Sequence, residues 1–318
     1  MPIITPLTDT NGDGKADDKD IPALVFQYGN GLWAWRGDTG ATIWHYLDTA
    51  NHPLSGLVAA GDLDGDGFPE LVAPRDASGT YGTYSNGLVK FDHNGNVMWD
   101  NAALLGAWNA AHGCNSLGYC QAITQNSRPL FADLAHDGKP EIIAGTAVVD
   151  SADGSIRWTG DQRYDFYKVS TVADLNLDGN PAVIDGYQAY NADGTLRWRN
   201  TSIPPDPGLN AVARFGDDPY PSVVLERGTS ISPVLYLLDH DGKILWGPVN
   251  INTSNWSVFS QPVVADVDGD GESEILVKGA DYLFAYDKNG NVKHSYSIPG
   301  DLYLDRVYAP TVFDLNGD

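Results

Sequence analysis

The chain has 318 residues, with 19 Lys and Arg against 42 Asp and Glu, which gives a formal net charge of −23 at pH 7. A charge of this sign repels phosphate backbones and anionic lipid surfaces, so we expect no nucleic-acid partner. The length suits one large all-β domain or two smaller domains, and the 35 Gly and 19 Pro among short apolar runs favour strands and turns over helices.

The sequence also bears on where the protein works. No segment approaches the ~18 to 20 uninterrupted apolar residues of a membrane-spanning helix, so we expect no membrane insertion. The amino terminus lacks a basic and then apolar leader, although such a signal is removed from mature exported proteins. Cys114 and Cys120 lie close together in a polar segment, which fits a local disulfide in an exported protein, with two free thiols as the alternative. We therefore expect a secreted or cell-surface protein.

An acidic, glycine-rich turn between two apolar runs recurs along the chain. Its clearest copy is "DLDGDGFPE" at 62–70. The first positions of the copies are Asp9, Asp62, Asp133, Asp174, Arg214, Asp266 and Asp314. They lie 40 to 53 residues apart, except for one interval of 71 that contains an insertion at 102–127. A period of this size is typical of a solenoid, a propeller or an array.

Each unit reads as four strands. In one copy the run "PVVAD" enters the acidic turn and "SEILVKG" leaves it, after which "YLFAYD" leads into the Asn-Gly hairpin of "DKNGNVKH". Four antiparallel strands in ~45 residues form a propeller blade. We therefore predict a single all-β propeller domain over 1–318. Its repeats lie near 3–50, 56–101, 128–161, 168–201, 209–250 and 260–298, with a partial repeat at 307–318.

Six units are complete and a seventh is only begun, because the sequence ends at "VYAPTVFDLNGD". We expect a fragment of a seven-bladed parent, with six blades plus an extra strand as the alternative. A tryptophan follows most of the hairpins, and we interpret this set as packing between blades. Its members are Trp44, Trp99, Trp158, Trp198 and Trp246.

The acidic turns are candidate metal sites. Carboxylates at positions 1, 3, 5 and 9, with Gly at 6 and a backbone carbonyl at 7, direct hard oxygen ligands at one point, which suits Ca²⁺. An EF-hand would need an acid at position 12, where Ala73 and Val277 stand. The complete sets are Asp9, Asn11, Asp13 and Asp17; Asp62, Asp64, Asp66 and Glu70; and Asp266, Asp268, Asp270 and Glu274. A catalytic use of these acids is disfavoured, because an active site need occur only once.

Three copies are eroded. The turn at 133 keeps Asp133, Asp137 and Glu141 but has Ala135 at position 3, so we expect weaker binding there. The turn at 174 keeps Asp174, Asn176 and Asp178 but has Ala182 at position 9. In the turn at 214, Arg214 stands at position 1, where its guanidinium can replace an ion, and we predict no metal.

These turns resemble the FG-GAP or VCBS repeats of the integrin α-subunit propeller and its bacterial relatives. The shared motif is D-x-[DN]-x-D-G-x-x-[DE] between two apolar strands, and it extends over nearly the whole chain. The resemblance implies a propeller with Ca²⁺ loops on one face, in a secreted or cell-surface protein that binds proteins or glycans. Calcium-ligand roles carry over to the three complete sets, while the eroded turns and the chain end depart from the pattern.

The loops on the opposite face are richer in aromatic and polar side chains, and loops carry function more often than the scaffold does. These side chains can stack on sugar rings or form a protein-binding hot spot, or they can simply fill the channel. The candidate ligand residues are Trp108, His112, Tyr119, Tyr164, Tyr167, Trp256, Tyr303 and Arg306.

Three functions remain open. The first is a calcium-stabilised recognition or adhesion module for a glycan or protein. The second is a structural subunit of a surface array, completed by strand addition at the unfinished blade. The third is a polysaccharide lyase that uses His52 or His112 with Tyr164 and Arg163 or Arg306. The sequence contains no Gly-x-Ser-x-Gly, His-Glu-x-x-His or phosphate-binding loop, so the non-enzymatic functions are favoured.

Overall fold

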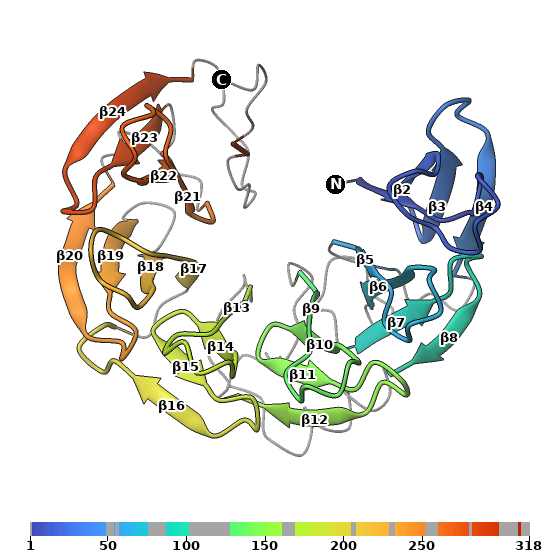
Figure 1. The fold of residues 1–318 in the computed structure, drawn as a ribbon, viewed down its shortest axis with the longest axis horizontal. Coiled ribbons are helices and arrows are strands. Elements are labelled where there is room, and N and C mark those ends of the chain that lie inside the picture. Colours follow the sequence, from blue (N-terminus) through green and yellow to red (C-terminus); the bar gives the residue numbers. More distant parts are fainter. Residues whose placement is uncertain are drawn as a thin grey trace. The chain divides into compact units, whose positions relative to one another are not determined.

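The computed structural model describes residues 2–48, 54, 57–75, 87–101, 128–160, 169–204, 208–228, 233–251, 260–279, 282–298 and 311–312. The regular structure of these residues consists of six four-stranded antiparallel sheets (Figure 1). In each sheet, strands that are consecutive in the chain are neighbours, which is the meander of a propeller blade. The predicted all-β fold of four-stranded units is therefore confirmed. The predicted partial repeat at 307–318 lies outside the described residues, apart from residues 311–312.

The chain divides into two compact units, Met1–Val169 and Ser170–Asp318, each with three sheets. The first sheet contains β1 (Ile3–Pro6), β2 (Pro22–Tyr28), β3 (Gly31–Arg36) and β4 (Thr42–Leu47). The second contains β5 (Ala59–Gly61), β6 (Glu70–Arg75), β7 (Gly87–Phe91) and β8 (Val97–Asp100). The third contains β9 (Leu130–Ala132), β10 (Glu141–Ala144), β11 (Ala147–Val149) and β12 (Ile156–Thr159).

The second unit repeats this arrangement. The fourth sheet contains β13 (Thr171–Ala173), β14 (Ala182–Asp185), β15 (Gln188–Tyr190) and β16 (Leu196–Arg199). The fifth contains β17 (Gly208–Ala213), β18 (Ser222–Arg227), β19 (Val234–Leu238) and β20 (Ile244–Asn250). The sixth contains β21 (Val263–Ala265), β22 (Glu274–Lys278), β23 (Tyr282–Tyr286) and β24 (Val292–Ser297).

The two middle strands of each sheet form the core. Successive side chains of a strand point to opposite faces, so a strand buried on both faces must be apolar at nearly every position. In β6, Leu71 packs in the core with the first sheet, whereas the next residue, Val72, packs with the third. In β18, Val223 and Val224 divide in the same way between the fourth and sixth sheets. The middle strands of the second and fifth sheets thus contribute to two interfaces, while the fourth strand β8 is largely exposed.

The hairpin tryptophans join neighbouring sheets within each unit. Trp44 lies against Gly95 of the second sheet and donates its indole N–H to the carbonyl oxygen of His93 at 2.8 Å. Trp246 repeats this contact against Gly290 and the Lys288 carbonyl at 2.7 Å. Trp99 and Trp198 do the same with the hairpins of the third and fifth sheets. The interpretation of these four tryptophans as packing between blades is confirmed.

Replacement of Gly242 by Ala tests this packing. An added Cβ would lie 2.4 Å from Cε3 of Trp198, and the φ of Gly242 is +79°. A left-handed Ala costs about 1–2 kcal/mol, and overpacking adds about 1–3 kcal/mol. The control is Gly40→Ala, because Gly40 has a φ of +69° but nothing within 4 Å. We expect Gly242→Ala to lower the free energy of unfolding by the larger amount in denaturant titrations. Equal losses would show that the indole contact contributes little.

Candidate metal centres

Six acidic loops join the first and second strands of the six sheets. They are the first (9–17), second (62–70), third (133–141), fourth (174–182), fifth (214–222) and sixth (266–274) acidic loops. All of the predicted metal ligands lie in five of these loops and among the described residues. Their side-chain contacts can therefore be compared position by position.

The aspartate at position 1 organises the loop that follows it. In the second loop, Asp62 accepts hydrogen bonds from the N–H groups of Gly65 at 2.7 Å and Gly67 at 3.0 Å. In the sixth loop, Asp266 accepts the equivalent pair from Gly269 and Gly271. The first, third and fourth loops also have a position-1 carboxylate bonded to the position-6 N–H. This carboxylate therefore holds the turn closed with or without a bound ion.

The backbone of these loops requires positive φ at two positions. Position 6 is glycine in all five loops that begin with Asp, with φ between 80° and 92°. Position 4 is glycine in the first, second and sixth loops, but it is His136 in the third and Leu177 in the fourth, at φ of 56° and 57°. A non-glycine residue in this region is strained by about 1–2 kcal/mol. The third and fourth loops therefore keep the same turn although they have lost a glycine as well as a ligand.

Position 9 places a buried glutamate at the start of the second strand. Glu70 and Glu274 are each 1% exposed, and each accepts a hydrogen bond from the N–H at position 2, at 2.8 Å from Leu63 and 3.0 Å from Val267. Burial raises the pKa of Glu70, against the opposing effects of the Leu63 N–H and Lys90. A bound cation would favour the ionised form of this side chain.

The first loop departs from the pattern at this position. Asp20, not Asp17, accepts the hydrogen bond from the N–H at position 2, at 2.7 Å from Thr10. Asp20 is 7% exposed, and it also accepts the N–H of Asp17 at 2.9 Å. Asp17 instead pairs with Lys15 at 2.6 Å. The sequence analysis missed Asp20, although it is the last acid before the strand that begins at Pro22; a ligand role for Asp17 stays a prediction.

Two loops bring three acids together. Carboxylate oxygens of Asp62, Asp64 and Asp66 lie within 4.8 Å of one another, and so do those of Asp266, Asp268 and Glu274. Oxygens that each lie about 2.3–2.6 Å from a shared Ca²⁺ are at most ~5 Å apart. The donor set and spacing of these two loops therefore fit a hard divalent cation.

The eroded fourth loop contains an unsatisfied ligand atom. The Oδ1 atom of Asn176 is buried and has no hydrogen-bond partner among the described residues, while its Nδ2 donates to Asp178 at 2.8 Å. A buried polar atom without a partner is costly, and a carbonyl oxygen at position 3 is a normal Ca²⁺ ligand. Occupancy of this loop stays a prediction, since Ala182 offers no ligand at position 9.

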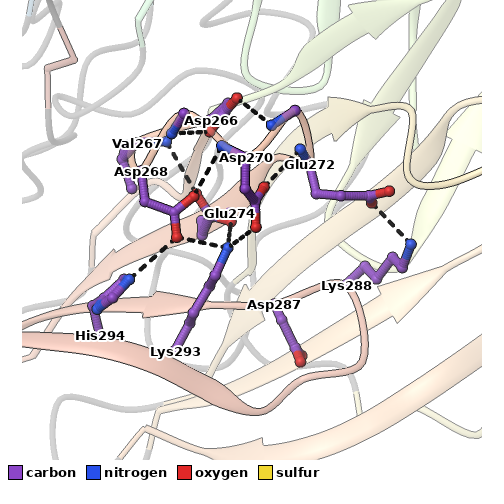
Figure 2. Close-up of polar contacts among 12 residues, drawn as sticks. Asp266, Val267, Asp268, Asp270, Glu272, Glu274, Asp287, Lys288, Lys293 and His294 are labelled. Atoms are coloured by element: carbon purple, nitrogen blue, oxygen red, sulfur yellow. Dashed lines mark hydrogen bonds and ion pairs between the residues drawn. The ribbon is translucent and has the colours of Figure 1, made fainter.

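The sixth loop already contains a positive charge. The ammonium group of Lys293, from β24, lies 2.7 Å from Asp268, 2.6 Å from Asp270 and 2.9 Å from Glu274 (Figure 2). These hydrogen bonds, first of all that with Asp268, raise the pKa of Lys293 well above its usual value. His294, the next residue, adds a contact to Asp268 at 3.3 Å. The ammonium thus occupies the point on which these carboxylates converge.

Side-chain cations reach two other loops in different ways. In the third loop, Arg157 from β12 lies 2.5 Å from Glu141 and 2.9 Å from Asp150. In the second loop, the buried Lys90 lies 3.8 Å from Glu70 and donates to the Ser151 carbonyl at 3.2 Å, so it approaches only the position-9 acid. In the fifth loop, Arg214 is exposed, and among the described residues no ion pair of its guanidinium is seen.

All eight candidate ligand residues on the opposite face lie outside the described residues, as do Cys114, Cys120, His52 and Arg163. Three connections on that side can be described. They are two-residue turns: Gly29 and Asn30 join β2 to β3, Gly145 and Thr146 join β10 to β11, and Gly186 and Tyr187 join β14 to β15. In these three sheets the connection from second to third strand is therefore too short to form a binding loop.

Buried polar side chains gather at the strand ends away from the acidic loops, which the sequence analysis did not foresee. Arg75, at the end of β6, pairs with Asp48 at 2.7 Å and with Asp100, linking the first and second sheets. In the second unit, Glu226 of β18 is fully buried, and its carboxyl group lies 3.4 Å from both the N–H and the hydroxyl of Ser260. Burial raises the pKa of Glu226 well above its usual value, against the opposing effect of the hydrogen bonds from Ser260.

Comparison with known proteins identifies the fold of the chain but shows no family. No family model and no curated protein matches the chain. Among solved structures, the V. cholerae biofilm matrix protein Bap1 has a TM-score of 0.58 at 22% identity, over 93% of this chain and 50% of that one. The rhamnogalacturonan lyase PL11 of Bacillus licheniformis has a TM-score of 0.60 at 18% identity, over 92% and 56%. The exotype rhamnogalacturonan lyase YesX has 0.55 at 17%, over 96% and 56%.

These solved structures are propeller proteins, so the comparison shows the propeller fold class. No family model supports the resemblance to FG-GAP or VCBS repeats. The chain spans about half the length of the solved structures described above. Among the residues that the structure describes, no helix has the length and apolar character needed to cross a membrane.

Replacement of Asp20 by Asn tests its role in the first loop. Hydrogen bonds from the N–H of Asp17, then from Thr10 and Asn11, lower the pKa of Asp20 to about 2. Because the native pKa lies below the unfolded value, Asp20 stabilises the fold above about pH 4, and this stability is lost as pH falls through about 2. In chelator, we expect Asp20→Asn to be less stable than wild type at pH 7 and nearly equal at pH 2. A matched control is Asp18→Asn, since Asp18 is exposed.

Replacement of Glu226 by Gln tests the buried acid of the second unit. The raised pKa means that the unfolded chain releases a proton before the native state does, so wild-type stability falls as pH rises above about 4.3. The slope is at most about 1.4 kcal/mol per pH unit. We expect Glu226→Gln to be more stable than wild type at pH 8 and similar at pH 4 in urea titrations. A loss of stability at pH 8 would show that Glu226 is ionised in the native state.

Proposed function

We propose that this chain is a calcium-stabilised propeller module that recognises a glycan or protein ligand outside the cell. The observation that carries the proposal is the recurrence of one hydrogen-bond pattern in five acidic loops, with three acids converging in the second and sixth. Recurrence at equivalent points in successive sheets suits a structural ion better than a catalytic centre, which would occur once. The outside of the cell supplies the millimolar Ca²⁺ that such sites use.

Calcium would act on the scaffold, and the ligand would bind elsewhere. Asp62, Asp64 and Asp66 repel one another when they are held within 4.8 Å, and a divalent cation between them offsets this repulsion. The backbone carbonyl at position 7, here Phe68, would complete the ligand set together with water. The recognition surface in this proposal is the set of aromatic and polar loops away from the acidic loops.

The solved structures favour carbohydrate as the class of ligand. Bap1 is a biofilm matrix protein, and YesX and PL11 are rhamnogalacturonan lyases, so the blades resemble those of proteins that work on or among extracellular polymers. The two lyases also make lyase activity the second candidate function. It ranks below recognition because a fold is shared by proteins of different activity. Assembly into a surface array is the outcome if no small ligand is found.

The metal part of the proposal is tested by thermal unfolding in chelator and in millimolar Ca²⁺. An ion that binds only the native state stabilises it by about 2.7 kcal/mol at a concentration 100 times its Kd. We expect Ca²⁺ to raise the melting temperature of wild type, and Asp64→Ala to reduce this rise. Asp18→Asn serves as the control for loss of one negative charge. Extracellular calcium modules have a Kd of up to about 1 mM, so 10 mM Ca²⁺ is about ten times the weakest of these values. An unchanged melting temperature at this concentration would overturn the proposal.

The ligand part is tested on a glycan array that includes rhamnogalacturonan fragments, in Ca²⁺ and in chelator. We expect saturable binding that is lost in chelator, because the acidic loops support the sheets that carry the recognition loops. Release of unsaturated sugar products from rhamnogalacturonan would instead establish the lyase alternative. A silent array together with calcium-dependent self-assembly would favour the array subunit.

A further inference from the structure

In all six sheets, the fourth strand has an extra, unpaired residue just before the position of the hairpin tryptophan. In the sixth sheet, Val292 pairs with Tyr286 and His294 pairs with Ala285, so Lys293 is an extra residue that pairs with nothing on β23. The register shifts at the equivalent place in the other five sheets. Such a bulge turns a side chain away from its normal direction. The six bulge residues are Ile43, Met98, Arg157, Arg197, Leu245 and Lys293.

In two sheets the side chain of the bulge residue reaches the acidic loop of its own sheet. Lys293 places its ammonium among Asp268, Asp270 and Glu274, as Figure 2 shows. Arg157, at the same place in the third sheet, contacts Glu141, the position-9 acid of its own loop. Two different cations therefore reach the acids of two different loops from one structural position.

The chemistry of the bulge residue varies with the loop that it faces. The second loop has a full set of acids and the uncharged bulge residue Met98, and the first loop, in which Asp17 pairs with Lys15, has the uncharged Ile43. The third and fourth loops are eroded, and their bulge residues are cationic, as Arg157 and Arg197. The fifth loop has lost its position-1 acid and faces Leu245. Only the sixth combines a full set of acids with a cation.

We propose that the bulge residue of the fourth strand decides whether an acidic loop binds a divalent ion, and that Lys293 closes the sixth loop with its own ammonium group. This inference rests on the proposed function, because it assumes that the open loops bind Ca²⁺. A calcium ion must displace the Lys293 ammonium from three carboxylates of the sixth loop. The apparent affinity of this loop for Ca²⁺ is therefore its intrinsic affinity multiplied by the fraction of molecules in which Lys293 is turned away. The second loop has Met98 at this position, and the cation near it, Lys90, approaches only the position-9 acid Glu70 at 3.8 Å.

Calcium titration calorimetry on the whole chain tests the inference with two variants, which exchange the bulge residues of the second and sixth sheets. Lys293→Met gives the sixth sheet the bulge residue of the second, and Met98→Lys gives the second sheet that of the sixth. If Lys293 occupies the loop in about nine of ten molecules or more, its removal tightens the sixth site by about tenfold or more. We expect Lys293→Met to gain a tight site that Asp268→Ala abolishes, Met98→Lys to lose one, and Lys293→Arg to resemble wild type.

Unfolding in chelator separates this role from general damage. Without an ion, Lys293→Met leaves Asp268, Asp270 and Glu274 without their cation, so we expect a lower melting temperature than wild type, and Ca²⁺ should then raise it by more. Lys293→Gln is the second variant if Lys293→Met folds poorly. If the other loops bind calcium but the sixth site is unchanged in Lys293→Met and Lys293→Gln, this inference is overturned and the proposed function is not. Absence of calcium binding in every variant would overturn the proposed function and this inference with it.

Discussion

In five of the six acidic loops, the position-1 aspartate accepts hydrogen bonds from the backbone that follows it, and the arrangement of the loop depends on this interaction. Asp62 and Asp266 bond to the position-6 N–H, which brings the chain around a glycine of positive φ. The turn then delivers a glutamate to the first residue of the second strand, where burial fixes its direction. Acids of the second and sixth loops converge and repel one another there, and a bound cation would offset this repulsion.

The acidic loops are also connected to the packing between sheets. The side chain at position 7 lies on the second residue of the hairpin in its own sheet: Phe68 stacks on His93 at 4.4 Å, and Tyr220 stacks on His240 at 4.3 Å. In the sixth sheet the same pair is Glu272 and Lys288, at 2.8 Å. The carbonyl oxygens of these hairpin residues accept the indole N–H of the tryptophan from the preceding sheet of the unit. The acidic loops therefore contact the same hairpin residues that accept the tryptophans of the neighbouring sheet.

In the proposed function, this arrangement separates the scaffold from the recognition surface. The acidic loops and the tryptophans repeat from sheet to sheet, so they define the fold and carry little information about a ligand. The connections at the other strand ends differ in length and composition, from the two-residue turn at Gly145 and Thr146 to the insertion at 102–127. Proteins that share blades can therefore differ in activity, as a biofilm matrix protein and rhamnogalacturonan lyases do.

The sequence by itself determined the four-stranded units, the place of each acidic loop and the packing role of the hairpin tryptophans, because these follow from local spacing and turn chemistry. Only the tertiary structure decided which charges meet. Asp20 takes the position-9 role from three residues beyond the motif, and Lys293 enters the sixth loop from a strand 19 residues after Glu274. A bulge of one residue sets the direction of Lys293. Spacing along the chain cannot predict such contacts, since they depend on strand register and burial across the sheet.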